Sequence, residues 1–254
     1  MSSFTFSMKA YVALIESAME SGFECISFNE AKAKLSLAGK HLLLRHDVDV
    51  SMEYALKMAE IEASMGAKST YFVMLRSPMY NLFSRYSSTC LRKIVELGHG
   101  IGLHYDAGYA QSSEKDIEGW LRFEVRTLSE MTGVAVDAFS FHQPTQLIID
   151  KRIYLDGLIN TYNSIQMSGY KYISDSNRVW KEQAPFSVFS THDKVQFLVH
   201  PVWWICEEDS TEGCWDQAIK SNFNIMQQQL LETERAYGKC RELELNRPDA
   251  QASS

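Results

Sequence analysis

Proline, paired cysteines and clustered basic charge are all scarce in this sequence of 254 residues. Its five prolines and 13 glycines form no linker or low-complexity block that would divide the chain. It has no Lys/Arg-rich run, and its net charge of -7 argues against a nucleic-acid surface. The cysteines contain no CxxC pair, which predicts free thiols rather than a disulfide framework or a thiolate zinc site: Cys25, Cys90, Cys206, Cys214 and Cys240.

The sequence also lacks a long apolar run and a secretory leader. Its first residues contain no basic segment followed by an apolar one, and no later stretch is long enough to span a bilayer. We therefore expect a cytoplasmic protein without a transmembrane segment. Hydrophobic residues make up 45% of the chain, which is ordinary for a globular protein. A single domain is expected over residues 1–245, followed by a disordered polar tail at 246–254.

Apolar runs alternate with helical periodicity along most of the chain. Helices are predicted over 7–20, 51–65, 88–97, from Ser112 or Ser113 to 132, and over 211–237. The last of these places Trp215, Ile219, Met226 and Leu230 on one side, which predicts that they pack in the core. Strands are predicted over 42–44, 69–74, 100–104, 138–141, 158–162, 171–174 and 195–199. This alternation indicates an α/β fold with a mainly parallel sheet, in which the strand ends share one side.

Polar side chains follow several of the predicted strands, namely Asp47, Asp49, His104, His142 and His200. Asp47 and Asp49 are two residues apart, so they share one face of a strand. Carboxylate and imidazole ligands together suit a divalent first-row cation. The alternatives are that Asp49 or Ser51 caps the following helix, and that each histidine is a hydrogen-bonded structural residue, as we expect His99 to be.

Five segments together resemble the polysaccharide deacetylase superfamily, also called the NodB-homology or carbohydrate esterase family 4 group. More narrowly, they resemble its HDVD-type branch associated with bacterial surface-polysaccharide genes. The order and spacing match over roughly residues 42–204. The segments are RHDVD at 45–49, GHGIGLHYD at 98–106, SFHQP at 140–144, SDSNRVW at 174–180 and LVHP at 198–201.

The resemblance implies a single distorted (β/α) barrel of about seven parallel strands. It also implies that Asp47 is the catalytic base, that Asp49 and His104 bind the metal, and that His200 is the general acid. Asp175 is expected to orient His200. The other residues expected to contact substrate are Arg45, Tyr105, Pro144, Arg178, Trp180 and Trp203. Arg45 pairs with a site carboxylate or reaches solvent, and the tryptophans form a wall for a sugar ring or simply pack.

One departure from the family pattern concerns the metal ligands. A second histidine is expected one helical turn after His104, where this chain has Gly108. Three repairs are open: His142 supplies the third ligand, Asp106 or His46 supplies it, or metal binding has been lost. We favour His142, because it replaces the customary arginine of the third motif in the same chain that lacks the other histidine.

These inferences predict a hydrolase that depends on a divalent metal ion, expected to be zinc, and acts on non-peptide carbon–nitrogen bonds. It would remove an N-acyl group, expected to be N-acetyl, from an N-acylated sugar, a nucleotide sugar or a carrier-linked saccharide. The alternatives are a deacetylase-like protein without catalysis that binds a saccharide or a partner, and a hydrolase of a non-sugar amide. The sequence does not indicate an oligomeric state.

Overall fold

The fold, seen in a computed structural model, is described for residues 5–28, 30–31, 39–111, 117–180 and 185–245. Seven strands form a parallel sheet in the order β6-β5-β4-β3-β2-β8-β7, and β1 also pairs with β2. They curl into a half-barrel, which confirms the predicted distorted barrel. The strands are β1 (Phe23–Ile26), β2 (Lys40–Val48), β3 (Thr70–Val73), β4 (Gly100–Asp106), β5 (Ala138–His142), β6 (Ile159–Asn160), β7 (Lys171–Ser174) and β8 (Lys194–Val199).

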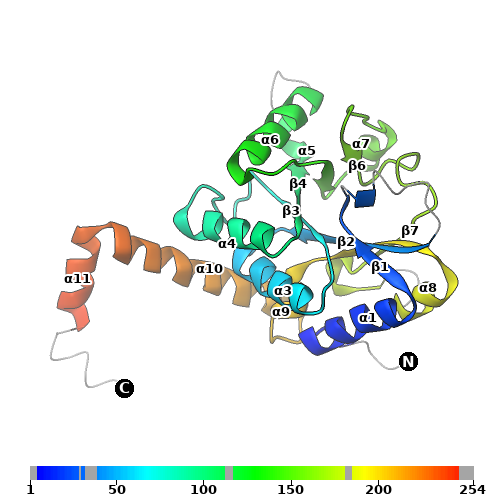
Figure 1. Cartoon of the computed structure of the whole chain (residues 1–254). Coiled ribbons are helices and arrows are strands. Elements are labelled where there is room, and N and C mark those ends of the chain that lie inside the picture. The colour runs from blue at the N-terminus through cyan, green and yellow to red at the C-terminus, as the bar shows by residue number, and fades with distance from the viewer. Residues whose placement is uncertain (1–4, 29, 32–38, 112–116, 181–184, 246–254) are drawn as a thin grey trace.

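Helices surround the sheet, and one long helix leads away from it (Figure 1). They are α1 (Met8–Glu20), α3 (Met52–Ser64), α4 (Arg85–Glu96), α5 (Ala107–Gln111), α6 (Ile117–Thr132), α7 (Gln146–Asp150), α8 (Pro185–Thr191), α9 (Pro201–Ile205), α10 (Thr211–Thr233) and α11 (Arg235–Leu245), with a 3₁₀ turn at Ser176–Arg178. None of the described helices is both long and apolar enough to cross a membrane.

The alternation of side chains along the strands produces two separate cores. In β2, Leu42 and Leu44 join the large core that also contains helix residues, whereas Leu43 joins a smaller one. In β3, Phe72 belongs with Leu43, and its neighbours Tyr71 and Val73 belong to the large core. Successive strand residues point to opposite faces, so the small core lies on the inner face of the sheet. Polar residues in phase with Leu43 therefore also point inward.

Two predicted helices differ from the structure. α4 begins at Arg85, three residues before the predicted start, because Ser84 caps it by accepting a hydrogen bond from Ser87 N at 3.2 Å. The predicted helix over 211–237 is two helices, since Glu234 between them has extended backbone angles. Its predicted core residues Ile219, Met226 and Leu230 are exposed. The proposed start at Ser112 or Ser113 and the tail 246–254 lie outside the described residues.

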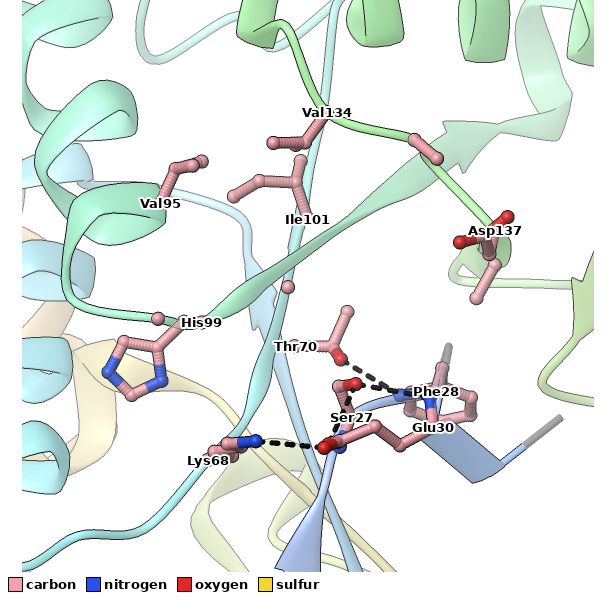
Figure 2. A pocket seen from close by; sticks show the side chains of 14 residues that line it. Ser27, Phe28, Glu30, Lys68, Thr70, Val95, His99, Ile101, Val134 and Asp137 are labelled. Carbon is pink, nitrogen blue, oxygen red and sulfur yellow. Dashed lines mark hydrogen bonds and ion pairs between the residues drawn. The ribbon is translucent and has the colours of Figure 1, made fainter. Parts of the chain in front are cut away.

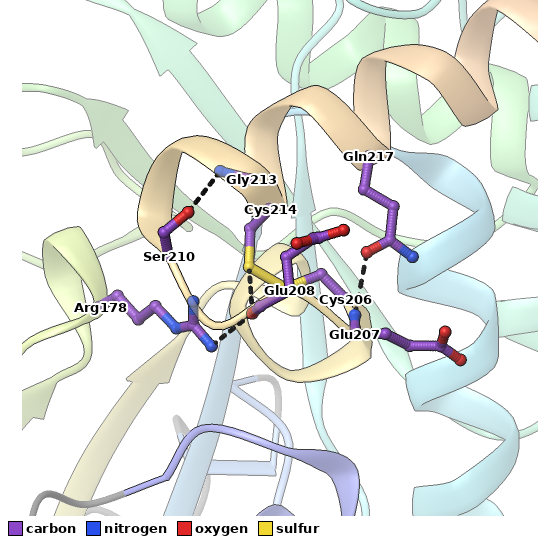
Figure 3. Close-up of a disulfide and its surroundings, with 8 residues drawn as sticks. All are labelled: Arg178, Cys206, Glu207, Glu208, Ser210, Gly213, Cys214 and Gln217. Atoms are coloured by element: carbon purple, nitrogen blue, oxygen red, sulfur yellow. Dashed lines mark hydrogen bonds between the residues drawn. A yellow bond between two sulfur atoms is a disulfide. The ribbon is translucent and has the colours of Figure 1, made fainter.

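The expectation of free thiols is wrong for two of the five cysteines. Cys206 and Cys214 form a disulfide that closes the loop between α9 and α10 (Figure 3). Within this loop, the Glu208 carbonyl accepts a hydrogen bond from Arg178 at 2.8 Å. The pairing was not visible in the sequence, because the two cysteines are eight residues apart without a recognised motif. Cys25, Cys90 and Cys240 are free thiols.

Candidate metal centre

β2 supplies the centre of the site with three inward-facing side chains. Arg45 and Asp47 lie within the strand, and Asp49 follows directly after its end. Ser51, rather than Asp49, caps α3 by accepting a hydrogen bond from Tyr54 N at 3.3 Å. His46 points to the helix side, where its Nε2 lies 2.7 Å from Glu62 Oε1. Asp49 is therefore free of a capping role, and the structure does not support His46 as the third metal ligand.

Asp49, His104 and His142 converge on one point. Asp49 Oδ1 lies 3.0 Å from His104 Nε2 and 3.2 Å from His142 Nδ1. The two ring nitrogens are 3.3 Å apart. These three are the one group of His, Cys, Asp and Glu side chains in the described part of the chain that is arranged to hold a metal ion. Their atoms come from the ends of β2, β4 and β5, as predicted from the positions after the strands.

The donor set fits a divalent cation. Asp49 Oδ1 is buried and has no hydrogen-bond partner of adequate geometry, although both ring nitrogens are close to it. On the far side of the His104 ring, Nδ1 lies 2.7 Å from Ser140 Oγ. Donation from Nδ1–H to Ser140 leaves the Nε2 lone pair directed at the cluster. One carboxylate and two imidazoles with room for further ligands are typical of an open, catalytic metal site.

The negative charge of Asp49 and the two imidazoles beside it stabilise one another. Burial alone raises the pKa of Asp49, but the nearby imidazoles of His104 and His142 hold this pKa far below its ordinary value. The nearby Asp49 carboxylate in turn raises the pKa of His142. Asp49 is consequently an anion at neutral pH. A bound cation would take over the interaction that the imidazoles make with it.

Asp47 is held by Arg45 from the same strand. Arg45 Nε and NH2 donate to its two carboxylate oxygens at 2.9 and 2.7 Å, and both residues are buried. Burial opposes ionisation of Asp47, but the charge and hydrogen bonds of Arg45, together with the nearby imidazoles of His104 and His200, lower the pKa of the carboxyl. This resolves the open question of Arg45 in favour of pairing with a site carboxylate.

Aromatic rings hold the Arg45 guanidinium in place. It lies 5.5 Å from the ring centroid of Phe72 and 4.9 Å from that of Tyr162, whose hydroxyl also accepts a hydrogen bond from it at 3.3 Å. Phe72 has space for its ring because residue 102 is glycine. A Cβ there would lie 2.5 Å from the Phe72 ring. Gly102, Phe72 and Tyr162 were not predicted as contributors to the site.

His200 lies between Asp175 and the Asp49 end of the cluster. Its Nδ1 lies 2.6 Å from Asp175 Oδ1, and its Nε2 lies 3.9 Å from Asp49 Oδ2. Asp175 is fully buried and also accepts hydrogen bonds from His200 N and from Trp204 Nε1, the latter at 2.7 Å. Burial lowers the pKa of His200, but the charge and hydrogen bond of Asp175, together with the charges of Asp49 and Asp47, raise this pKa to about 9. The pairing of His200 with Asp175 agrees with the predicted roles.

Gly108 stands where the family pattern has its second histidine, and the structure shows what replaces that side chain. The Asp106 carboxylate accepts a hydrogen bond from Gly108 N at 2.9 Å. A Cβ at Gly108 would lie 3.0 Å from the same Asp106 oxygen. Asp106 therefore serves as a local cap and is not a member of the cluster, which leaves His142 as the third candidate ligand.

The remaining predicted contact residues have different surroundings. Tyr105 is buried in the large core on the helix side of β4, so the structure does not place it at the site. Trp203 is 3% exposed and packs against Trp215. Trp180 stacks on Phe6 at 5.7 Å. Arg178 bonds to the Glu208 carbonyl, and Pro144 is half-buried two residues after His142.

A separate cavity lies at the other end of the strands (Figure 2). It has a volume of about 250 Å³ and is lined by Thr70 and Gly100, which begin β3 and β4. The ion pair between Lys68 and Glu30 crosses it at 2.8 Å. It includes His99, whose ring bonds to Ser69 and to the Ala59 carbonyl, in agreement with the structural role predicted for it. The cavity contains none of the predicted site residues.

Comparisons with known proteins give structural matches alone. No family model and no curated protein sequence matches the chain. A family 4 carbohydrate esterase from Bacillus anthracis is 14% identical, with a TM-score of 0.41 over 87% of this chain and 88% of its own. The catalytic domain of a peptidoglycan N-acetylglucosamine deacetylase from Eubacterium rectale is 16% identical, with a TM-score of 0.46 over 74% and 86%. A family 4 pseudoenzyme from Bacillus anthracis is 17% identical, with a TM-score of 0.41 over 73% and 61%. The chain thus has structural similarity to family 4 carbohydrate esterases at low sequence identity.

Proposed function

We propose that this protein is a metal-dependent hydrolase that removes an N-acyl group, expected to be N-acetyl, from a sugar or a carbohydrate precursor. The observation that supports it is the convergence of Asp49, His104 and His142. The buried carboxylate of Asp47 and the protonated imidazole of His200 lie next to this cluster. Zinc is our proposed ion, since two imidazoles and one carboxylate suit it. When bound, the ion supplies positive charge that polarises an amide carbonyl and stabilises the oxyanion.

The surrounding residues divide the proton transfers between them. Asp47 is ionised, so it accepts a proton from the attacking water, and Arg45 fixes its orientation. His200, on the other hand, is protonated at neutral pH, so it donates a proton to the leaving amine. Asp175 stabilises the charged imidazole and, together with Trp204, fixes its position. Both proton-transfer groups stand close to the cluster: Asp47 Oδ2 lies 3.7 Å from His104 Nδ1, and His200 Nε2 lies 3.9 Å from Asp49 Oδ2.

The experiment is a hydrolysis assay on the zinc-loaded protein, followed by amine release for N-acetylated substrates and by carboxylate formation for cyclic imides and ureides, whose ring opening frees no amine. The substrates are N-acetyl sugars, N-acetylated nucleotide sugars and, as a separate class, cyclic imides and ureides. We expect turnover of at least one N-acetyl sugar compound, with a loss of at least about 100-fold in Asp47→Asn and in His200→Gln. His192→Gln is the matched control, because His192 is only partly buried and lies outside the site, with its ring beside the Thr191 hydroxyl.

Three results would contradict the proposal. Turnover of a non-sugar amide alone would reject the sugar. Binding of saccharides without turnover would indicate a protein that has kept the fold and lost the chemistry. Turnover that survives both substitutions would reject the assigned roles.

A further inference from the structure

We propose that two copies of this chain form an antiparallel dimer through an apolar stripe on α10. The stripe consists of Ile219, Phe223, Met226 and Leu230, which expose 47%, 56%, 51% and 38% of their surface. Their spacing of four, three and four residues places them along one side of the helix. An apolar side of this kind is normally covered, and here it faces solvent.

Beyond its first turns, α10 contacts the rest of the chain through polar side chains and has no buried apolar residue. It has 23 residues, about 34 Å of helix, and its fully buried residues are Cys214 and Ala218. Figure 1 shows it leading away from the sheet toward α11. Most helices in proteins are stabilised by packing of their apolar face rather than by intrinsic propensity. A partner for the stripe would supply that packing.

The two flanks of the stripe are already occupied by polar contacts within the chain. On one flank, Asn222 donates to the Val50 carbonyl at 2.7 Å, and Gln229 accepts from Tyr86 N at 3.3 Å. On the other flank, Gln227 donates to the Tyr237 hydroxyl at 3.2 Å. The stripe therefore lies between two rows of polar side chains that are already engaged within the chain.

A cavity beside the stripe adds apolar surface of the body to it. Next to Ile219, Phe223 and Met226 there is a cavity of about 440 Å³, whose other wall includes Met52 and Met79. A helix that packs here would bring apolar side chains at the same spacing of three and four residues. A second α10 carries such a stripe.

The stripe is complementary to itself when the two helices run in opposite directions. Ile219 then meets Leu230 of the partner subunit, and Phe223 meets Met226 of the partner subunit. Because the dimer is two-fold symmetric, each of these pairs occurs twice and every stripe residue has an apolar partner. In a parallel pair both bodies would lie at the same end, and Lys220 would face Lys220 of the partner subunit. The antiparallel arrangement avoids both conflicts.

Charge favours a second copy as the occupant. The chain carries a net charge of -7, which disfavours contact between most of its surfaces. Residues 221–231 contain no Asp, Glu, Lys or Arg. Two copies can therefore meet here without like-charge repulsion.

The exposed apolar area also agrees with a stable dimer. At roughly 200 Å² for each large side chain, the exposed fractions amount to about 400 Å² of apolar surface on each chain. A standard interface of about 800 Å² per partner contains roughly 450 Å² of apolar area.

The test is sedimentation equilibrium of the full chain at 1–100 μM, with Phe223→Glu/Met226→Glu as the disrupting variant. We expect the parent to have the mass of two 29.0 kDa chains and the variant to have the mass of one. The dimer dissociation constant should rise at least about 100-fold. Ile165→Glu is the matched control, since Ile165 is 74% exposed and outside α10. A monomeric parent, or a variant that still dimerises, would overturn the proposal; a monomeric parent would assign the stripe to a different partner.

Oxidative cross-linking tests the orientation without disturbing the stripe as a whole. In a Cys240→Ser background, a mixture of Ile219→Cys and Leu230→Cys chains should cross-link at least about fivefold more than either chain alone. Cross-linking of Ile219→Cys with itself to the same extent would reject the antiparallel pairing. Circular dichroism of each variant confirms that the chain is folded.

Discussion

Asp175 controls the protonation of His200 from a fully buried position. Its carboxylate lies 2.6 Å from His200 Nδ1 and, together with the charges of Asp49 and Asp47, raises the pKa of the imidazole to about 9, against an ordinary value of 6.5. In Asp175→Asn the negative charge is lost, so this pKa should fall by about one to two units. Because the proposed acid works in its charged form, the alkaline limit of activity should move to lower pH by the same amount. NMR titration of the His200 ring and a pH–rate profile measure both. An unchanged alkaline limit would mean that His200 is not the acid.

Sequence reasoning succeeds at the residue scale where the strand itself fixes the geometry. The two-residue repeat placed Asp47 and Asp49 on one side at the end of β2, and the position of His142 at the end of β5 placed it near His104 of the neighbouring strand β4. The hydrogen bonds of Trp204 to Asp175 and of Arg45 to Tyr162 could not be predicted, since each joins segments that are distant in the sequence. The contact of Ser140 with His104 is also between distant segments. Ser140 alone had a signal, because it stands two residues before His142 in the same strand.

Glu62 connects α3 to two strands and another helix. Its buried carboxylate bonds to the Tyr11 hydroxyl, to His46, to Ser69 at 2.6 Å and to Tyr71 at 2.8 Å. Burial opposes ionisation, but His46 and these hydrogen bonds lower the pKa of Glu62 from 4.5 to about 2. A lowered carboxyl pKa stabilises the fold above the unfolded pKa, and this stability is lost as the pH falls toward 2.

Glu62→Gln should therefore destabilise the fold most above pH 5. The difference in free energy of unfolding between parent and variant should shrink by about 2 kcal/mol from pH 5 to pH 3. Urea unfolding at several pH values measures it. Glu60→Gln on the same helix serves as the comparison and should show no such trend. A difference that is constant with pH would show that Glu62 is not ionised in the fold.

At the scale of elements, periodicity identified the helices but not what covers them. The repeat over 211–237 correctly indicated an apolar side, yet Ile219, Met226 and Leu230 lie outside the core. A period of 3.6 residues shows that a helix has an apolar face, and says nothing about which surface packs on it. The break at Glu234 has no Gly or Pro to mark it in the sequence. Helix ends set by capping serines, such as Ser7 and Ser51, were predicted to within a residue.

The disulfide between Cys206 and Cys214 affects the stability of the whole chain. It closes a short loop and so reduces the freedom of the unfolded state. Cys206→Ser/Cys214→Ser should lower the free energy of unfolding by about 2–3 kcal/mol under oxidising conditions. Urea unfolding measures this, with Cys240→Ser as the control at an exposed free thiol. A count of five free thiols in the denatured parent would contradict the pairing.

For the whole molecule, the strand and helix order was enough to predict a mainly parallel sheet, whereas the distorted barrel was predicted from the family resemblance. The predicted strands all exist, although β6 is reduced to Ile159–Asn160, and β1 adds to the sheet beside β2. Alternation along the chain dictates parallel pairing, because a helix must return the chain to the same end of the sheet. It does not dictate how far the sheet closes, since that depends on packing of the inner side chains, such as Phe72 against Gly102.

The metal content of the protein tests the central claim most directly. Protein purified without chelator, then incubated with zinc and desalted, is analysed by mass spectrometry for bound metal, beside Asp49→Ala, His104→Ala and His142→Ala. We predict close to one divalent ion per chain in the parent and in the His192→Ala control, and a loss of at least about tenfold in each of the three variants. A parent without metal after incubation with zinc would contradict the account. A His142→Ala variant that keeps its full metal content would also contradict it.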